Sequence, residues 1–344
     1  FRGLRDWLFT RLLIQSGVYQ MAGGFEANTR KKLIRQPTLV KPAGGGPTTL
    51  AIQRTGLLAR IYLNITGTVS GSGAALNPMG LSSIIRRVRL VANSGLELFS
   101  VSGPGYAHIL QHLLESERGP VTPANQGTNV VADGAFNLDM MIPVAVSLMN
   151  FTGLVLTQSE QILVTLEIDW EADTAVGGTG TTVTATATPY VEFFSIPSSP
   201  EDAPDLTRAH VILEDTRTIA GSGEQIYEPL RRPTYLQLAH GFGFAAGNAG
   251  VDNFDRLQLR IEQSNYLFDG DVNAADIEFN LYHGVQRPRG IWVYDFMASS
   301  GLGNYLTARD RVNTSLITSF ESVFNATAPG TLYTIRRMLI DLAS

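Results

Sequence analysis

The segments Arg87-Val-Arg-Leu90 and Asn93-Ser-Gly-Leu-Glu-Leu98-Phe99 recur later in the chain as Arg256-Leu-Gln-Leu259 and Gln263-Ser-Asn-Tyr-Leu267-Phe268. A shift of 169 positions pairs Arg87 with Arg256 and Phe99 with Phe268. Upstream, a shift of 176 aligns residues 48–67 with 224–243. The seven-residue difference falls in the Gly- and Ser-rich stretch 67–81, where loop length is free to vary. The sequence therefore predicts one β-domain that is used twice.

The composition is that of a folded protein with many turns. Apolar residues make up 44% of the 344 residues and charged residues 17%, with 34 glycines and 16 prolines. This length favours two domains, at roughly 150 residues each. Cysteine is absent, which excludes disulfides, thiolate nucleophiles and cysteine-ligated metals within this sequence. No apolar run approaches the roughly 20 residues of a membrane-spanning helix, and we expect no signal peptide.

Charge is distributed unevenly along the chain, although the net charge is only -5. Residues 1–54 hold nine of the 26 basic residues and two of the 31 acidic ones, a balance of +7. The other residues carry 17 basic and 29 acidic side chains, a balance of -12. A basic end on an acidic body is typical of a protein that faces a polyanion, either nucleic acid or an anionic lipid surface.

The first 14 residues have the spacing of an amphipathic helix. The apolar stripe is formed by Phe1, Leu4, Leu8 and Leu12, with Trp7 at its edge. Arg5 and Arg11 flank the stripe. Such a helix can lie on a membrane, or it can pack against its own domain or a neighbouring subunit. Residues 17–47 are rich in glycine, proline and basic residues and are expected to form an extended arm, with Arg30, Lys31, Lys32 and Arg35 as its basic residues.

From residue 48 onward, short apolar runs with period 2 indicate β-strands. The expected strands are 58–65, 88–91, 96–99, 162–170, 212–214, 235–238, 257–261, 277–282 and 291–294. Residues 106–117 have helical spacing, and residues 176–188 are expected to form a flexible hairpin or surface loop. Repeated prolines at 197–204 predict an inter-domain linker, because proline is excluded from helix interiors and central strands. Strands at this spacing with few helices favour antiparallel sandwiches.

The sequence offers no convincing catalytic or cofactor site. His108 and His112 stand at i and i+4, as in some zinc sites, but the glutamate of H-E-x-x-H is missing and no third ligand is obvious. The glycine clusters match neither dinucleotide-binding nor P-loop spacing. Three carboxylate pairs are expected in solvated turns, at Glu201-Asp202, Glu214-Asp215 and Asp269-Gly-Asp271. We therefore expect no enzyme activity, no cofactor and no metal.

Two arginine clusters occupy nearly matched places in the two repeats. They are Arg86-Arg87-x-Arg89 and Arg231-Arg232. A solvated or salt-bridged strand edge explains them at least as well as contacts to phosphate. Outside the basic arm no nucleic-acid recognition motif is present, so no sequence-specific nucleic-acid partner is expected.

Together these features resemble the double-jelly-roll major capsid proteins of icosahedral viruses with an internal membrane, the lineage that includes the adenovirus hexon. The residues that carry the resemblance are the duplicated blocks 48–99 and 224–268, the linker and the N-terminal segment. The resemblance implies an all-β chain of two tandem antiparallel jelly-roll sandwiches with a few short helices. The implied domains are an N-terminal helix and arm (1–47), a first jelly roll (48–197), a linker (198–204) and a second jelly roll (205–344).

The implied function is that of a structural protein that trimerises into pseudo-hexameric capsomers and tiles an icosahedral shell. Its partners would be other copies of itself, with the internal viral membrane and minor capsid or vertex proteins as further candidates. Its place would be the virion, after assembly in the host cytoplasm. The alternative is a two-domain β-sandwich module for adhesion or carbohydrate binding, which a monomeric state would favour. A tailed-phage shell protein of mixed α/β fold is disfavoured because long helices are scarce, and an enzyme is least favoured.

Overall fold

The fold is known from a computed structural model of the chain. The structure describes residues 25, 28–71, 79–93, 95–115, 134–146, 151–158, 162–177, 179–243, 252–262, 265–284, 286–297 and 311–342. The expected N-terminal helix lies outside these residues.

Eight main strands of the first half form a sandwich of two antiparallel sheets. One sheet has the order β1-β10-β4-β7 and the other β3-β9-β5-β6. The bounds are β1 Lys31–Arg35, β3 Gly46–Ala51, β4 Leu57–Ser70, β5 Ile85–Ala92, β6 Leu96–Val101, β7 Gly134–Pro143, β9 Val164–Trp170 and β10 Thr182–Phe194. The two-residue strands β2 (Leu39–Val40) and β8 (Val155–Leu156) pair with β10 and β4. Strand β9 alternates buried and half-buried residues, as a strand between a core and solvent must.

The second half repeats this plan with eight further strands. Their bounds are β11 Arg208–Ile219, β12 Gly223–Tyr227, β13 Thr234–Phe242, β14 Phe254–Ile261, β15 Asn265–Asp271, β16 Ile291–Asp295, β18 Phe320–Ala326 and β19 Gly330–Asp341. The sheet orders are β11-β19-β13-β16 and β12-β18-β14-β15, and β17 (Val312–Asn313) adds to β13. If the main strands of each half are counted in chain order, both halves have sheets ordered 1-8-3-6 and 2-7-4-5. This is a jelly-roll arrangement.

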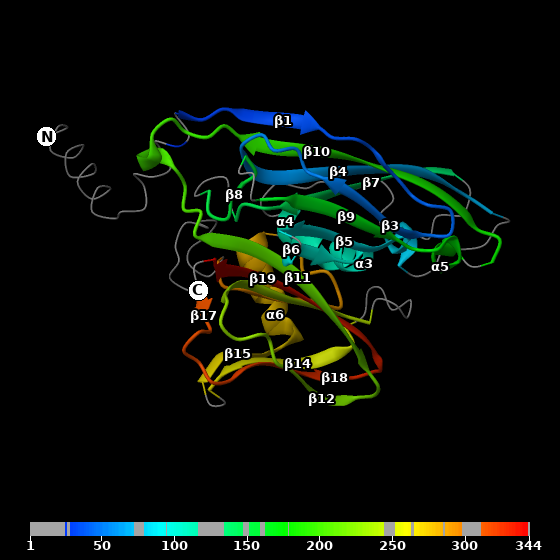
Figure 1. The fold of residues 1–344 in the computed structure, drawn as a ribbon. Coiled ribbons are helices and arrows are strands. Elements are labelled where there is room, and N and C mark those ends of the chain that lie inside the picture. The colour runs from blue at the N-terminus through cyan, green and yellow to red at the C-terminus, as the bar shows by residue number, and fades with distance from the viewer. Residues whose placement is uncertain are drawn as a thin grey trace, which may run out of the picture.

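The two sandwiches are joined edge to edge. Strand β11 lies parallel to β6, with Ile212 opposite Phe99 and Leu213 opposite Ser100, so that one sheet of each half merges into a nine-stranded sheet (Figure 1). A single hydrophobic cluster extends through both sandwiches. Residues 198–204, the expected linker, fall between β10 and β11 and include the short helix η3 (Pro200–Asp202).

The repeat detected in the sequence is present in the backbone as well. In the β5–β6 hairpin, Leu90 pairs with Phe99 and the register shifts directly after Leu90. In the β14–β15 hairpin, Leu259 pairs with Phe268 and the register shifts directly after Leu259. The hairpin turns also correspond, because Asn93 and Glu262, 169 positions apart, have positive φ angles of 52° and 54°.

Each hairpin is followed by a helical segment before the sixth strand. In the first half this segment consists of α3 (Gly103–Gly105), the π-helix η2 (Tyr106–Leu110) and α4 (Gln111–Glu115), close to the helix expected from the sequence. In the second half it is α6 (Val272–His283). The other short helices are η1 (Gly80–Ile84) and α5 (Asp173–Gly177). The two N-caps are 169 positions apart: Ser102 accepts from the Gly105 N–H, and Asp271 accepts from the Ala274 N–H.

The strand expected at residues 277–282 is wrong, because these residues belong to α6. Their apolar and polar residues alternate, which indicated a strand, but the helix is specified at its ends. The Asp271 carboxylate accepts the Ala274 N–H at 2.9 Å, and Gly284 ends the helix in the left-handed conformation with φ 69°. An N-cap oxygen and a left-handed glycine satisfy the terminal backbone groups of a helix.

The surface loop expected at 176–188 is also largely wrong, because β10 begins at Thr182. In its N-terminal half, valine and alanine point to the core while threonine points outward. The threonines face threonines of β4 across the sheet, for example Thr184 and Thr68 with hydroxyl oxygens 2.7 Å apart. β-Branched threonine pairs of this kind stabilise an exposed sheet face, so a segment with few large side chains forms a central strand.

Candidate assembly surfaces

A buried carboxylate lies where the two sandwiches meet. Glu214 is on β11, not in the turn expected from the sequence, and is almost fully buried. Its Oε2 accepts hydrogen bonds from the backbone N–H and the hydroxyl of Ser102, each at 2.9 Å. Burial raises the pKa of Glu214, while the bonds from Ser102 oppose the shift. The N-cap of the first sandwich's helix is thereby bound to the first strand of the second sandwich.

A buried arginine forms a second link between the halves. Arg337 on β19 donates from Nε to His210 Nε2 at 2.9 Å and from Nη2 to the Val146 carbonyl at 2.8 Å. Val146 follows β7 of the first sandwich, whereas His210 is on β11. Burial lowers the pKa of His210, and the charge of Arg337 lowers it further. The imidazole therefore stays neutral and can accept the bond.

The helical segments of the two halves differ in what covers them. In the first half, η2 packs against β13 and α3 against β19, both in the second sandwich. Its apolar side chains Ile109 and Leu110 are fully buried. In the second half, α6 exposes 69% of Ile277 and 59% of Leu281, which share one helix face. The contact between sandwiches thus covers one helical segment and leaves the other open.

The basic residues expected in an arm are largely in a strand. Lys31, Lys32 and Arg35 lie on β1, the edge strand of the first sheet, so the first sandwich begins near residue 31 and not at 48. Lys31 pairs with the buried Glu192 at 2.9 Å, whereas the side chains of Lys32 and Arg35 are exposed. Arg30 precedes the strand; its backbone N–H donates to the Ser195 hydroxyl, and its carbonyl accepts from the Ser195 N–H. All five residues of β1 pair with β10, and Ile34 packs against the hydrophobic cluster while Leu33 is exposed.

The residues expected in the N-terminal helix are Phe1, Leu4, Arg5, Trp7, Leu8, Arg11 and Leu12, and all lie outside the described residues. Their role stays a prediction.

The first arginine cluster is salt-bridged within the sheet. Arg86 lies 2.5 Å from Glu171, and Arg89 makes two hydrogen bonds to Glu167, at 2.8 and 2.9 Å. In the second cluster, Arg231 donates to the Thr318 carbonyl. The salt-bridged interpretation therefore agrees with the structure for Arg86 and Arg89 on β5, whereas Arg231 lies between β12 and β13 and contacts a backbone carbonyl.

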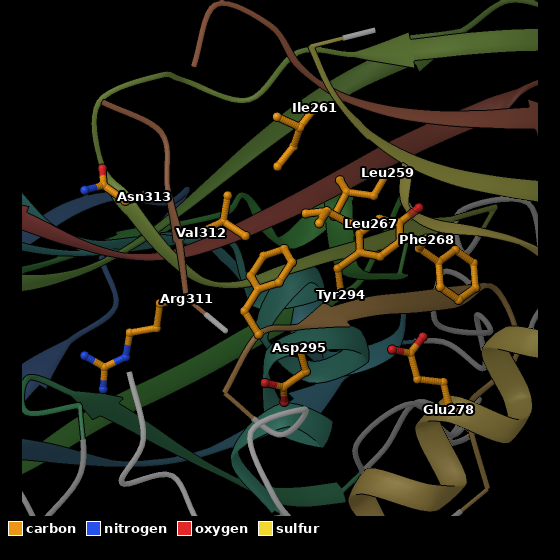
Figure 2. A pocket seen from close by; sticks show the side chains of 11 residues that line it. Leu259, Ile261, Leu267, Phe268, Glu278, Tyr294, Asp295, Arg311, Val312 and Asn313 are labelled. Carbon is orange, nitrogen blue, oxygen red and sulfur yellow. The ribbon is translucent and has the colours of Figure 1, made fainter. Parts of the chain in front are cut away.

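A cavity of about 580 Å³ opens in the second sandwich (Figure 2). Seven of its eleven lining residues are aliphatic or aromatic: Leu259, Ile261, Leu267, Phe268, Tyr294, Phe296 and Val312. Glu278 from α6 and Asp295 from β16 add two carboxylates, and Arg311 adds a cation. Burial, helped by the charge of Asp295, raises the pKa of Glu278 to about 7. Sequence analysis missed this carboxylate pair, because residues 277–282 were expected to form a strand.

The candidate metal residues form no metal site in the described part of the chain. There, no three His, Asp or Glu side chains cluster as metal ligands would. Burial, with a smaller contribution from His112, lowers the pKa of His108 to about 4. Of the carboxylate pairs, Asp202 accepts from Asn28 and Asp271 caps α6.

No described helix has the length and hydropathy needed to cross a bilayer.

The tandem jelly-roll fold is found in viral coat proteins. No protein-family model matches the sequence, and comparison with curated proteins finds no match. Among solved structures, the MCP (major capsid protein) of Sulfolobus Turreted Icosahedral Virus is 18% identical with a TM-score of 0.68 over 91% of this chain and 96% of that chain. The PBCV-1 virus capsid is 12% identical with a TM-score of 0.62, over 91% of this chain and 94% of that chain. The major capsid protein P2 of bacteriophage PM2 is 14% identical with a TM-score of 0.56, over 90% of this chain and 97% of that chain.

At these identities the likeness establishes the fold, and it covers nearly all of the chain and of each similar protein. The chain has the tandem jelly-roll fold of viral major capsid proteins. The expected class, all-β with two tandem antiparallel jelly-roll sandwiches and a few short helices, is confirmed.

Proposed function

We propose that this protein is a structural major capsid protein, which trimerises into pseudo-hexameric capsomers and tiles an icosahedral shell. The observation that carries the proposal is the pair of sandwiches with identical strand order, joined edge to edge into one unit. Similarity to three viral capsid proteins along nearly the whole chain supports it.

Physical reasoning supports assembly as the function of such a chain. Two similar modules per chain allow a three-fold ring to present six nearly equivalent sides, which suits a hexagonal lattice. The junction holds the modules in a fixed relation, because Glu214 and Arg337 are buried and hydrogen-bonded across it. A shell protein needs self-complementary surfaces and no substrate cavity with catalytic groups.

The test is the oligomeric state of the purified protein. Three chains of 37.3 kDa give about 112 kDa, which light scattering or mass photometry resolves from a monomer. We expect this mass, six-sided particles in electron micrographs, and shells in the native source. A protein that stays monomeric at micromolar concentration would contradict the proposal and favour the adhesion or carbohydrate-binding module.

The finer proposals concern the virion. We place the N-terminal segment with Phe1, Trp7 and Arg11 toward the internal viral membrane, since an apolar stripe flanked by cations suits an anionic lipid surface. Minor capsid or vertex proteins are further partners, and assembly takes place in the host cytoplasm before the protein resides in the virion.

Deletion of residues 1–20 tests the N-terminal role. We expect trimers to persist, because β1 and all later strands are retained, while flotation with vesicles of anionic phospholipid or closure of shells fails. Neutral vesicles serve as the control for charge. Unchanged flotation and unchanged shell assembly would remove the role given to this segment.

A further inference from the structure

The contact between the two sandwiches uses three elements that each occur twice in the chain. Strand β6 and the helical segment after it, from the first sandwich, contact the β11 side of the second sandwich. In the repeated plan, β15 is the equivalent of β6, α6 is the equivalent of α3 to α4, and β1 is the equivalent of β11. Among the described residues, β15 pairs only with β14, and β1 only with β10. One chain therefore carries both halves of an equivalent contact that it does not make with itself.

The sheet registers show which residues correspond. On one side, the shift of 169 takes Phe99 to Phe268 and Ser100 to Asp269.

On the other side, the β1–β10 pairing is compared with the β11–β19 pairing. In the first, Ile34 faces Val191 and Arg35 faces Tyr190. In the second, Ile212 faces Arg337 and Leu213 faces Arg336. Strand β10 pairs with β4, where Leu63 faces Pro189, and β19 pairs with β13, where Ala239 faces Ile335. The shift of 176 takes Leu63 to Ala239, so Pro189 corresponds to Ile335, and β10 corresponds to β19 by a shift of 146. Ile34 and Arg35 are therefore the counterparts of Ile212 and Leu213.

The chemistry of the two open edges is complementary. The pair Ser100 and Leu213 within the chain corresponds to Asp269 and Arg35, two exposed residues of opposite charge. Strand β1 carries three cations, of which Lys31 pairs with Glu192. Strand β15 carries Asp269, which also contacts Arg256 and Gln258, and Asp271, which caps α6. Exposed apolar side chains accompany both edges, with Leu33 on β1, Tyr266 and Leu267 on β15, and Ile277 and Leu281 on α6. Opposite charges on facing edges set register and suppress wrong pairings.

We propose that β1 of one subunit lies beside β15 and α6 of the next subunit, with Arg35 opposite Asp269, and that this contact repeats the junction within the chain. The partner is a second copy of this chain. Because the two surfaces differ, the contact is head to tail, and a three-fold rotation closes it into a ring of three subunits. The inference rests on the proposed self-assembly and adds to it the surface and the register.

Disulfide trapping tests the inference, because the chain has no cysteine of its own. Neighbouring strands lie roughly 4.8 Å apart, within the Cα separation of disulfides. Oxidation of the variant Arg35→Cys with Asp269→Cys should give covalent trimers on a non-reducing gel. The matched control is Arg35→Cys with Ile226→Cys, since Ile226 is exposed on β12, the opposite edge of the sheet that contains β15. It should remain monomeric on the gel.

The outcomes separate this inference from the proposed function. Trimers in solution that give no cross-link from the 35/269 pair, or equal cross-linking in the control, would overturn the inference alone. Covalent species that stop at dimers would also overturn it, because they indicate a two-fold contact. A monomer before and after oxidation would overturn the inference and the proposed function together.

A charge exchange provides a second measurement without new covalent bonds. Arg35→Asp and Asp269→Arg should each shift mass photometry toward monomers at limiting concentration, whereas the double exchange should restore trimers. Circular dichroism of each variant verifies that the sandwiches are folded. Single variants that assemble like the parent protein, or a double exchange that fails to recover, would count against the register.

Discussion

Substitution of Arg287 is expected to lower the stability of the second sandwich strongly. Its side chain is fully buried, and its Nε donates to Asp276 Oδ1 at 2.6 Å. Its Nη1 and Nη2 donate to the two oxygens of Asp252, each at 3.0 Å. Asp276 is on α6 and Asp252 precedes β14, so the guanidinium holds the helix against the sandwich. Replacement by methionine keeps much of the volume and removes every donor.

The magnitude follows from burial. Removal of one partner of a buried ion pair costs about 3–5 kcal/mol, because the remaining charges lose their compensation. For 344 residues the unfolding entropy near 60 °C is about 0.7 kcal/mol/K, so Tm should fall by about 4–7 °C. Arg289 is the matched control, since it contacts the same two carboxylates but is 41% exposed. An exposed pair is worth about 0–1 kcal/mol, so Arg289→Met should lower Tm by roughly 1 °C.

The assay is thermal unfolding of the parent and both variants at one protein concentration and pH 7. A second series in 1 M NaCl separates the two variants further. The salt should remove most of the small decrease in Tm caused by Arg289→Met and leave most of the decrease caused by Arg287→Met, because buried pairs are poorly screened. Equal losses in the two variants, or an Arg287→Met protein as stable as the parent, would refute the reasoning that burial determines the magnitude.

Two further predictions concern the junction and the cavity. Gly105→Ala places a Cβ 1.9 Å from Glu214 Oε2 and should lower the free energy of unfolding by roughly 1–3 kcal/mol in denaturant titration, whereas Gly134→Ala, with open space around its Cβ, should not. For Glu278, whose pKa is raised from 4.5 to about 7 chiefly by burial and further by Asp295, the charged form disfavours folding, so stability is fully present below pH 4.5 and is lost as pH rises through 7. Glu278→Gln should therefore unfold at a higher Tm than the parent at pH 8 and show no difference below pH 4.5, and parallel Tm curves from pH 4 to 8 would contradict this.

Some elements were predictable because their signal is local. The hairpins at 87–99 and 256–268 combine period-2 alternation with a turn, and the structure repeats even the register shift after Leu90 and Leu259. Other elements were not predictable from pattern alone. The alternation at 277–282 resembled a strand, but the N-cap at Asp271 and the glycine at 284 made a helix.

The candidate assembly surfaces depended still more on pairing. The basic residues at 31–35 suggested an arm, because their charges outnumber their apolar side chains, and pairing with β10 made them an edge strand. Glu214 looked like a solvated turn residue and is instead buried against Ser102. In each case the partner is more than 100 residues away, and no local pattern contains that information.

The sequence by itself determined the all-β class and the doubled sandwich, because alternation and turn residues act over a few neighbouring positions and recur in both halves. Only the tertiary structure decided that β6 and β11 join the sandwiches, whereas the outer edges of β1 and β15 pair with no other described strand. Edge pairing is a long-range choice: backbone hydrogen bonds are the same for every pair of strands, so burial and charge across the whole fold select the partner.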